Sequence, residues 1–149
     1  MVEAEPVLLA LIAADKIITE AQNNKKTIVG TFTNFFAASF PALFPPWAIY
    51  FSFTNVVDEH TFSINVVNDR TQQVIFSAGG QCTSAEPSAV VELVVPAFPV
   101  TFPEKGVYTI IAHLDGQPLA SRILTVTPVA AQGGPPATMN DASQPRGDN

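Results

Sequence analysis

Two β-rich runs on either side of Asp115-Gly116 constrain the fold of this chain more than any other feature. Glycine tolerates the positive φ of a tight hairpin turn, and Asp-Gly between two apolar runs is a strong hairpin signal. The run before the turn has the two-residue period of a strand, with one apolar face made of Tyr108, Ile110, Ala112 and Leu114. Because an isolated hairpin is only marginally stable in water, the rest of the chain must supply a sheet that covers it.

Further strand patterns recur along the chain at intervals of roughly a dozen residues. The clearest is 60–67, where Phe62, Ile64 and Val66 alternate with polar residues, as in a sheet with one face in water. The apolar run 6–13 is consistent with a strand buried on both faces and also with a helix, because periodicity does not separate the two in short runs. Together, the patterns predict an all-β, antiparallel β-sandwich of about eight strands.

The composition changes after Pro128. From 129 to 149 the chain consists mostly of Gly, Pro, Ala and polar residues, with Val129 and Met139 as its only large apolar side chains. Such a segment buries too little surface to offset the entropy lost on ordering. The predicted domain therefore spans 1–128, and 129–149 is predicted to be a disordered polar tail.

Charge and cysteine content exclude several classes of partner. Only 13% of the residues are charged, against about 25% in a typical soluble domain, and the net charge of −6 includes no basic cluster for nucleic acid. The lone Cys82, in a predicted polar loop over 79–87, suits a reducing compartment and predicts a cytoplasmic location. The charge-free span 27–57 is long enough for a membrane helix, but Pro41, Pro45 and Pro46 interrupt it, so we expect no membrane insertion.

No arrangement of residues in the sequence points to catalysis. His60 follows Asp58-Glu59, and this group could hold a divalent cation, but metal sites need three or four converging ligands and no spacing provides them. The remaining histidine, His113, lies within a predicted strand. There is no phosphate-binding loop or cysteine pair either. We therefore expect a protein that is not an enzyme, with no catalytic residue, no metal site and no cofactor.

Eight aromatic residues between 35 and 53 are the most unusual feature of the composition. They suit the core of the sandwich and a loop folded over its open end. An exposed part of this segment would instead form an apolar patch for a protein partner, since large apolar patches rarely remain bare. The predicted contact residues are Phe40, Leu43, Phe44 and Trp47. The leading hypothesis is an interaction or assembly module that binds another protein or its own copies, and the alternative is a small-ligand or carbohydrate-binding domain built on Trp47.

Several segments together resemble an uncharacterised family of small bacterial proteins known only as a domain of unknown function. They are 11–18, 26–32, the Phe40-Pro41-Ala42 sequence, the aromatic strand through Tyr50, and 103–119 with its Gly-x-Tyr and Asp-Gly pairs. The chain departs from the family at Ala14, where a cysteine is common. The resemblance implies an immunoglobulin-like or related β-sandwich, and it implies no activity.

Overall fold

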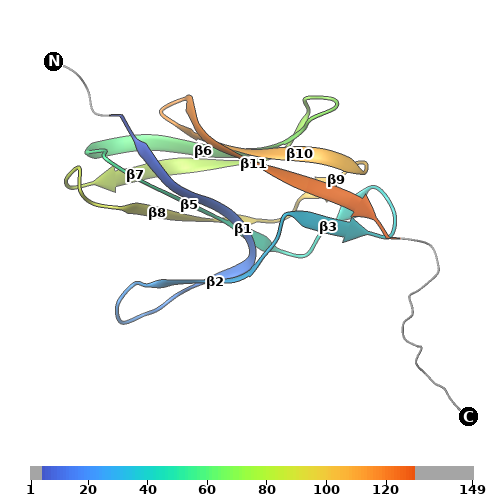
Figure 1. Ribbon diagram of the computed structural model, residues 1–149, viewed down its shortest axis with the longest axis horizontal. Helices are drawn as coiled ribbons and strands as arrows, with labels where there is room; N and C mark the ends of the chain where they lie inside the picture. The colour runs from blue at the N-terminus through green and yellow to red at the C-terminus, as the bar shows by residue number, and fades with distance from the viewer. Residues whose placement is uncertain (1–4, 130–149) are drawn as a thin grey trace, which may run out of the picture.

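The computed structural model describes residues 5–129, which form eleven strands and no helix (Figure 1). The predicted all-β class is confirmed, and none of the described residues lies in a helix that could cross a membrane. The strands are β1 (Val7–Thr19), β2 (Lys26–Thr31), β3 (Asn34–Ala37), β4 (Ala42–Leu43), β5 (Trp47–Thr54), β6 (Asp58–Asn68), β7 (Val74–Ser84), β8 (Val91–Ala97), β9 (Thr101–Phe102), β10 (Gly106–Leu114) and β11 (Gln117–Pro128).

Two main sheets form the layers of the sandwich. One has the order β2-β1-β5-β8 and the other the order β3-β11-β10-β6-β7. All neighbours pair antiparallel except β3 and β11, which are parallel. The short strands β4 and β9 form a separate two-stranded sheet. Apolar side chains from both main sheets fill the space between them, among them the fully buried Phe51, Phe53, Ile64 and Leu124.

The hairpin predicted at Asp115-Gly116 is confirmed. It joins β10 to β11, and both turn residues have positive φ, 51° at Asp115 and 80° at Gly116. These angles belong to the primed turn that matches the right-handed twist of paired strands. The predicted inner face of β10 is buried along its whole length, because β10 is the central strand of its sheet and this face packs into the core between the two sheets.

The first apolar run is a strand, β1, and it is not buried on both faces at its start. Val7, Leu8 and Leu9 are exposed, because this part of β1 pairs with β5 on one edge only and a bulge interrupts the register after Leu8. Beyond Ala14, β1 leaves β5 and pairs with β2 instead. The resulting ribbon projects from the body of the molecule (Figure 1).

The loop predicted over 79–87 is strand as far as Ser84. A Cβ atom at Gly79 would lie 2.7 Å from the carbonyl oxygen of Phe62, so the glycine allows β7 to pass close to β6. Cys82 is consequently an inward-facing strand residue instead of a loop residue, and it is buried.

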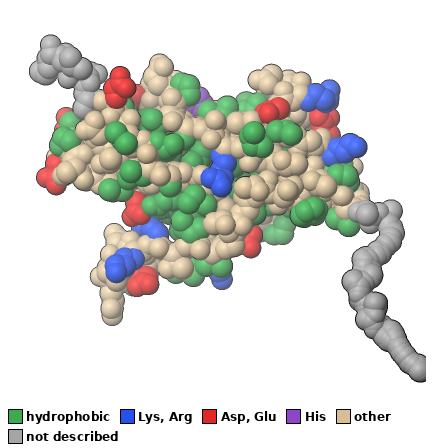
Figure 2. All heavy atoms as spheres, in the orientation of Figure 1, with side chains coloured by type: hydrophobic (Ala, Val, Ile, Leu, Met, Phe, Trp, Pro, Cys, Tyr) green, Lys and Arg blue, Asp and Glu red, His purple; other side chains and the backbone are tan. Residues whose placement is uncertain are grey.

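At the other end, β11 ends at Pro128, and the backbone N–H of Val129 donates to the carbonyl of Ala37 at 2.8 Å. Val129 thus still belongs to the sheet edge, whereas the rest of the predicted tail, 130–149, lies outside the described residues. On the face shown in Figure 2, the charged side chains lie mostly towards the ends of the body, with hydrophobic side chains exposed between them.

Candidate functional site

The aromatic segment after β2 closes one end of the sandwich. Phe35 lies at its centre, stacked on Phe44 with 4.2 Å between ring centroids and in edge contact with Trp47 and Phe102. Phe102 in turn makes an edge contact with Tyr108 on β10. Offset-stacked and edge-to-face pairs of this kind add about 0.5–1.5 kcal/mol each beyond area burial. Most of the unusual aromatic content is therefore core packing.

The four predicted contact residues differ in how much of each side chain is exposed. Trp47 is only 4% exposed, because it is the first inward-facing residue of β5 and lies against Phe32 and Phe35. The expectation that Trp47 forms a contact surface is therefore wrong. Phe40 and Phe44 are half-buried against the core, whereas Leu43 is 59% exposed. Leu43 alone presents most of its side chain to solvent.

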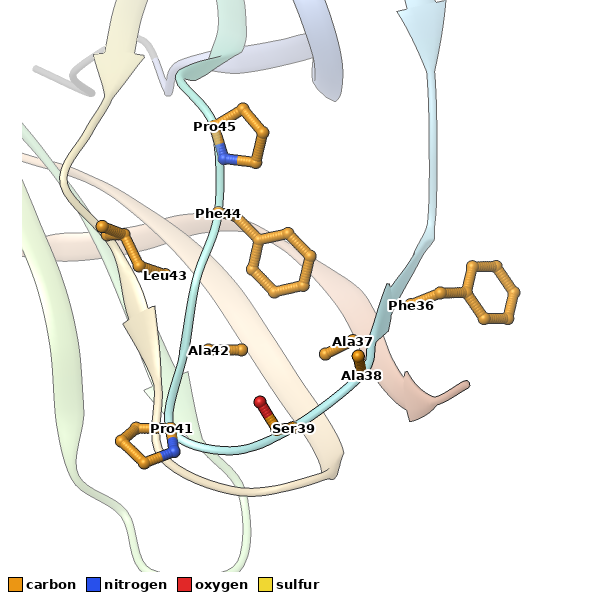
Figure 3. A pocket seen from close by; sticks show the side chains of 9 residues that line it. All are labelled: Phe36, Ala37, Ala38, Ser39, Pro41, Ala42, Leu43, Phe44 and Pro45. Carbon is orange, nitrogen blue, oxygen red and sulfur yellow. The ribbon is translucent and has the colours of Figure 1, made fainter. Parts of the chain in front are cut away.

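Residues 37–45 form an arch that leads from β3 through β4 towards β5 and borders an open hollow of about 370 Å³ (Figure 3). In Figure 3, the side chains of Ala37, Ser39 and Phe44 lie towards the inside of the arch, and the ring of Phe36 points away from it. The lining carries no charge and consists of Phe36, Ala37, Ala38, Ser39, Pro41, Ala42, Leu43, Phe44 and Pro45. Such a hollow offers no charged side chain that could hold an ion.

Main-chain contacts hold the arch in place. Its Ala42 and Leu43 pair with Phe102 and Thr101 of β9, and the N–H of Phe44 donates to the carbonyl of Val100 at 3.3 Å. The arch is thus tied to the loop before β9.

Two further aromatic residues are exposed and were not predicted as contact residues. Phe36 on β3 is 63% exposed, and Phe98 in the loop before β9 is 50% exposed. The exposure of Phe36 could have been predicted from strand alternation. Successive side chains point to opposite faces of a strand, and its neighbour Phe35 faces the core. No sequence pattern indicates the exposure of Phe98, which lies between β8 and β9 and is not part of the lining of the hollow. We call Phe36 and Leu43, together with the hollow that they help to line, the arch surface.

The histidines occupy different settings. The ring of His60 lies between two acceptors, with Nδ1 2.5 Å from a carboxylate oxygen of Asp115 and Nε2 2.8 Å from the carbonyl oxygen of Val57. A neutral imidazole has only one N–H to donate, so this geometry favours the charged ring. The hydrogen bond to Asp115 raises the pKa of His60, and that bond likewise lowers the pKa of Asp115.

Among residues 5–129, no hydroxyl or thiol is hydrogen-bonded to the His60 ring, whose second nitrogen faces the backbone carbonyl of Val57 instead. The second oxygen of Asp115 accepts from the backbone N–H of Thr61 at 2.9 Å, which secures the hairpin tip to β6. His113 has a buried Nδ1 with no hydrogen-bond partner. Within residues 5–129, no three His, Cys, Asp or Glu side chains converge as metal ligands do.

A second polar cluster joins the β6–β7 turn to the loop before β10. Arg70 donates two hydrogen bonds to the carboxylate of Glu104, both at 2.7 Å, and the buried Asn68 donates a third at 3.2 Å. These donors lower the pKa of Glu104 to about 2. Because every member has a partner within the fold, the cluster acts as a clamp between two loops.

Comparison with known proteins identifies a family without a described activity. The model of DUF6941, a family of unknown function, matches residues 9–127. This range is close to the one over which the sequence itself shows a resemblance, and it covers nearly all of the described sandwich. None of the curated proteins matches the chain.

Proposed function

The chain belongs to DUF6941, a family of unknown function, and from this premise we propose that it is a non-enzymatic interaction module whose arch surface binds another protein. One observation carries the proposal: two large apolar side chains, Phe36 and Leu43, stand exposed at a hollow whose lining carries no charge. Exposed apolar side chains that cluster in one place are a common mark of an interaction site, because large apolar patches seldom remain in contact with water.

The composition of the arch surface matches the centre of a protein interface. Interface cores are depleted in charge and enriched in aromatic residues, and no charged residue occurs between 27 and 57. Because the arch is tied to β9, binding requires little ordering of the backbone, which is the main cost of using a loop. The partner that fits is an apolar segment that inserts one side chain into the hollow and covers Phe36 and Leu43.

A small apolar ligand is the second candidate. The hollow lies within the roughly 300–1,000 Å³ range of ligand pockets, and the Ser39 hydroxyl is the only polar side-chain group in its lining. Because the indole of Trp47 is buried, it cannot serve as the surface on which a carbohydrate would stack.

We further propose that the sandwich is immunoglobulin-like and acts in the cytoplasm. Three features support the immunoglobulin-like fold. The edge strand β3 is parallel to β11, and the same sheet continues in the order β11-β10-β6-β7. Tyr108, at the start of β10, donates a hydrogen bond to the backbone four residues earlier. The cytoplasmic proposal is supported by the lone Cys82 and the acidic composition.

The test of the arch surface uses the full chain as bait in a lysate of its native host, followed by titration of each captured protein in purified form. The variant Phe36→Ser/Leu43→Ser should lose the partner at least about tenfold in affinity, as expected when two exposed apolar contacts are removed. Ile123→Ser is the matched control, because Ile123 is 60% exposed on β11 away from the arch. Equal binding by wild type and both variants contradicts the proposal. Binding of small apolar compounds by wild type, with no protein partner, supports the second candidate instead.

A further inference from the structure

The arch and the C-terminal segment of the chain begin at the same place in the fold. Strands β3 and β11 run side by side and parallel, with Ala37 opposite Pro128, and the backbone N–H of Val129 donates to the carbonyl of Ala37 at 2.8 Å (Figure 1). Ala37 is also part of the lining of the hollow. The chain therefore leaves the described sandwich at the border of the arch surface. From this position we propose that residues 130–140 fold back over the arch surface and that the side chain of Met139 enters its hollow.

The chemistry of this segment matches that of the arch surface. From 130 to 140 the chain carries no charge, and Met139 is its only large apolar side chain. The lining of the hollow likewise carries no charge. Methionine is unbranched and flexible, so it adapts to irregular apolar spaces. Met139 is thus the side chain of the segment that fits the hollow.

The residues between Val129 and Met139 suit a chain that turns back and then docks. Glycine tolerates the positive φ of tight reversals, and Gly133-Gly134 precedes Met139. Proline has a fixed φ, so the Pro135-Pro136 pair loses less backbone entropy when the segment docks. A segment of this composition cannot form a core by itself. The arch surface supplies the apolar contact that the segment lacks.

The length of the connection favours a contact within one chain. Met139 follows Val129 by ten residues (139 − 129 = 10), and ten residues span up to about 35 Å when fully extended. A segment tethered this close to its site acts at an effective concentration on the order of millimolar. Even a weak contact is therefore populated within one chain at protein concentrations too low for the same contact between two copies.

This inference rests on the proposed function, because it gives the proposed binding site a second occupant from the same chain. The segment and a protein partner need the same hollow, together with the exposed side chains of Phe36 and Leu43, so they exclude each other. When the segment occupies the hollow in about 90% of the molecules, the apparent affinity for the partner falls about tenfold. The segment would then act as an internal competitor of the partner.

The first test is NMR of the full chain with isotope-labelled methionine methyl groups, and it needs no partner. Met139→Ser removes one of the two methionines and so assigns its signal. We expect the Met139 methyl to be shifted upfield by the ring of Phe44, which lies towards the inside of the arch (Figure 3), and to show a nuclear Overhauser effect to that ring. Both effects should be lost in Phe36→Ser/Leu43→Ser. They should persist in the control Ile123→Ser, which changes an exposed residue of β11 away from the arch.

Three results would overturn the inference. They are a Met139 methyl at the chemical shift of an unfolded chain, a signal that is the same in the arch variant and in wild type, and a contact that grows with protein concentration and so joins two copies.

The second test measures competition with a purified partner that the full chain captures. Met139→Ser should bind this partner about tenfold more tightly than wild type does, whereas the control Ala142→Ser, beyond the segment, should bind as wild type does. Equal affinities of all three chains would contradict the competition. A docked Met139 in a chain without any partner supports this inference and contradicts the proposed function. A partner that binds the arch surface while Met139 stays free supports the proposed function and overturns this inference.

Discussion

The hydroxyl of Tyr108 donates a hydrogen bond to the carbonyl oxygen of Glu104, four residues earlier, at 2.7 Å. Tyr108 is fully buried, and its hydrogen bond holds the loop before β10 against the start of that strand. Tyr108→Phe keeps the ring and removes the donor, so we expect it to lower the free energy of unfolding by about 1–2 kcal/mol. Urea denaturation measures this.

The matched control for that change is Tyr50→Phe. The Tyr50 hydroxyl bonds the Glu92 side chain at the surface, where water replaces a lost partner. We expect a change below about 0.5 kcal/mol. Equal effects of the two substitutions would show that the Tyr108 bond has no special role in the fold.

The His60–Asp115 pair predicts a pH dependence of stability. The folded pKa of His60 is raised, so its contribution is complete below about pH 6.5 and is lost as pH rises through the folded pKa. The folded pKa of Asp115 is lowered, so its contribution is present above about pH 3.9 and is lost on acidification. The pair therefore stabilises the fold most between these limits, by less than about 1 kcal/mol because it lies near the surface.

Asp115→Asn tests the electrostatic part of this pair. The amide oxygen can still accept from Thr61, and Asn-Gly is as good a turn pair as Asp-Gly. We expect the His60 pKa, followed by NMR of its ring protons, to fall relative to wild type. An unchanged titration would mean that Asp115 does not hold the charged ring.

Neighbouring positions in the arch should respond differently to truncation. Phe44→Ala removes a half-buried ring that stacks on Phe35 and contacts Phe102, and we expect a loss of about 2–3 kcal/mol. Leu43→Ala removes an exposed side chain and should change stability by less than about 0.5 kcal/mol. Thermal and urea unfolding measure both. A large loss at Leu43 would show that its side chain packs against the fold and is not free to bind.

Cys82 should be protected from alkylation in the native protein. Burial raises the pKa of its thiol, and only the thiolate reacts. We expect iodoacetamide at pH 8 to modify the native chain far more slowly than the chain unfolded in urea, as mass spectrometry can follow. Rapid native modification would place the thiol in an accessible conformation.

Local signals in the sequence were sufficient for much of the fold. The Asp115-Gly116 turn, the alternation on β6 and β10 and the prolines that exclude a membrane helix each depend on neighbours in the chain, and the structure agrees with them. The prediction of a loop around Cys82 was wrong as far as Ser84. Glycine weakens a strand by its local propensity, but it can also mark a place where another backbone comes close. At Gly79, the close approach of Phe62 makes glycine the residue that permits a strand.

The sequence by itself determined an all-β domain, because the two-residue period and the turn residues are properties of the chain at short range. Only the tertiary structure decided which aromatic residues are core and which are surface. Trp47 and Leu43 lie four positions apart in one apolar segment, yet one is buried by Phe32 and Phe35 and the other points outward from β4. That difference depends on which strands pack together at the end of the sandwich.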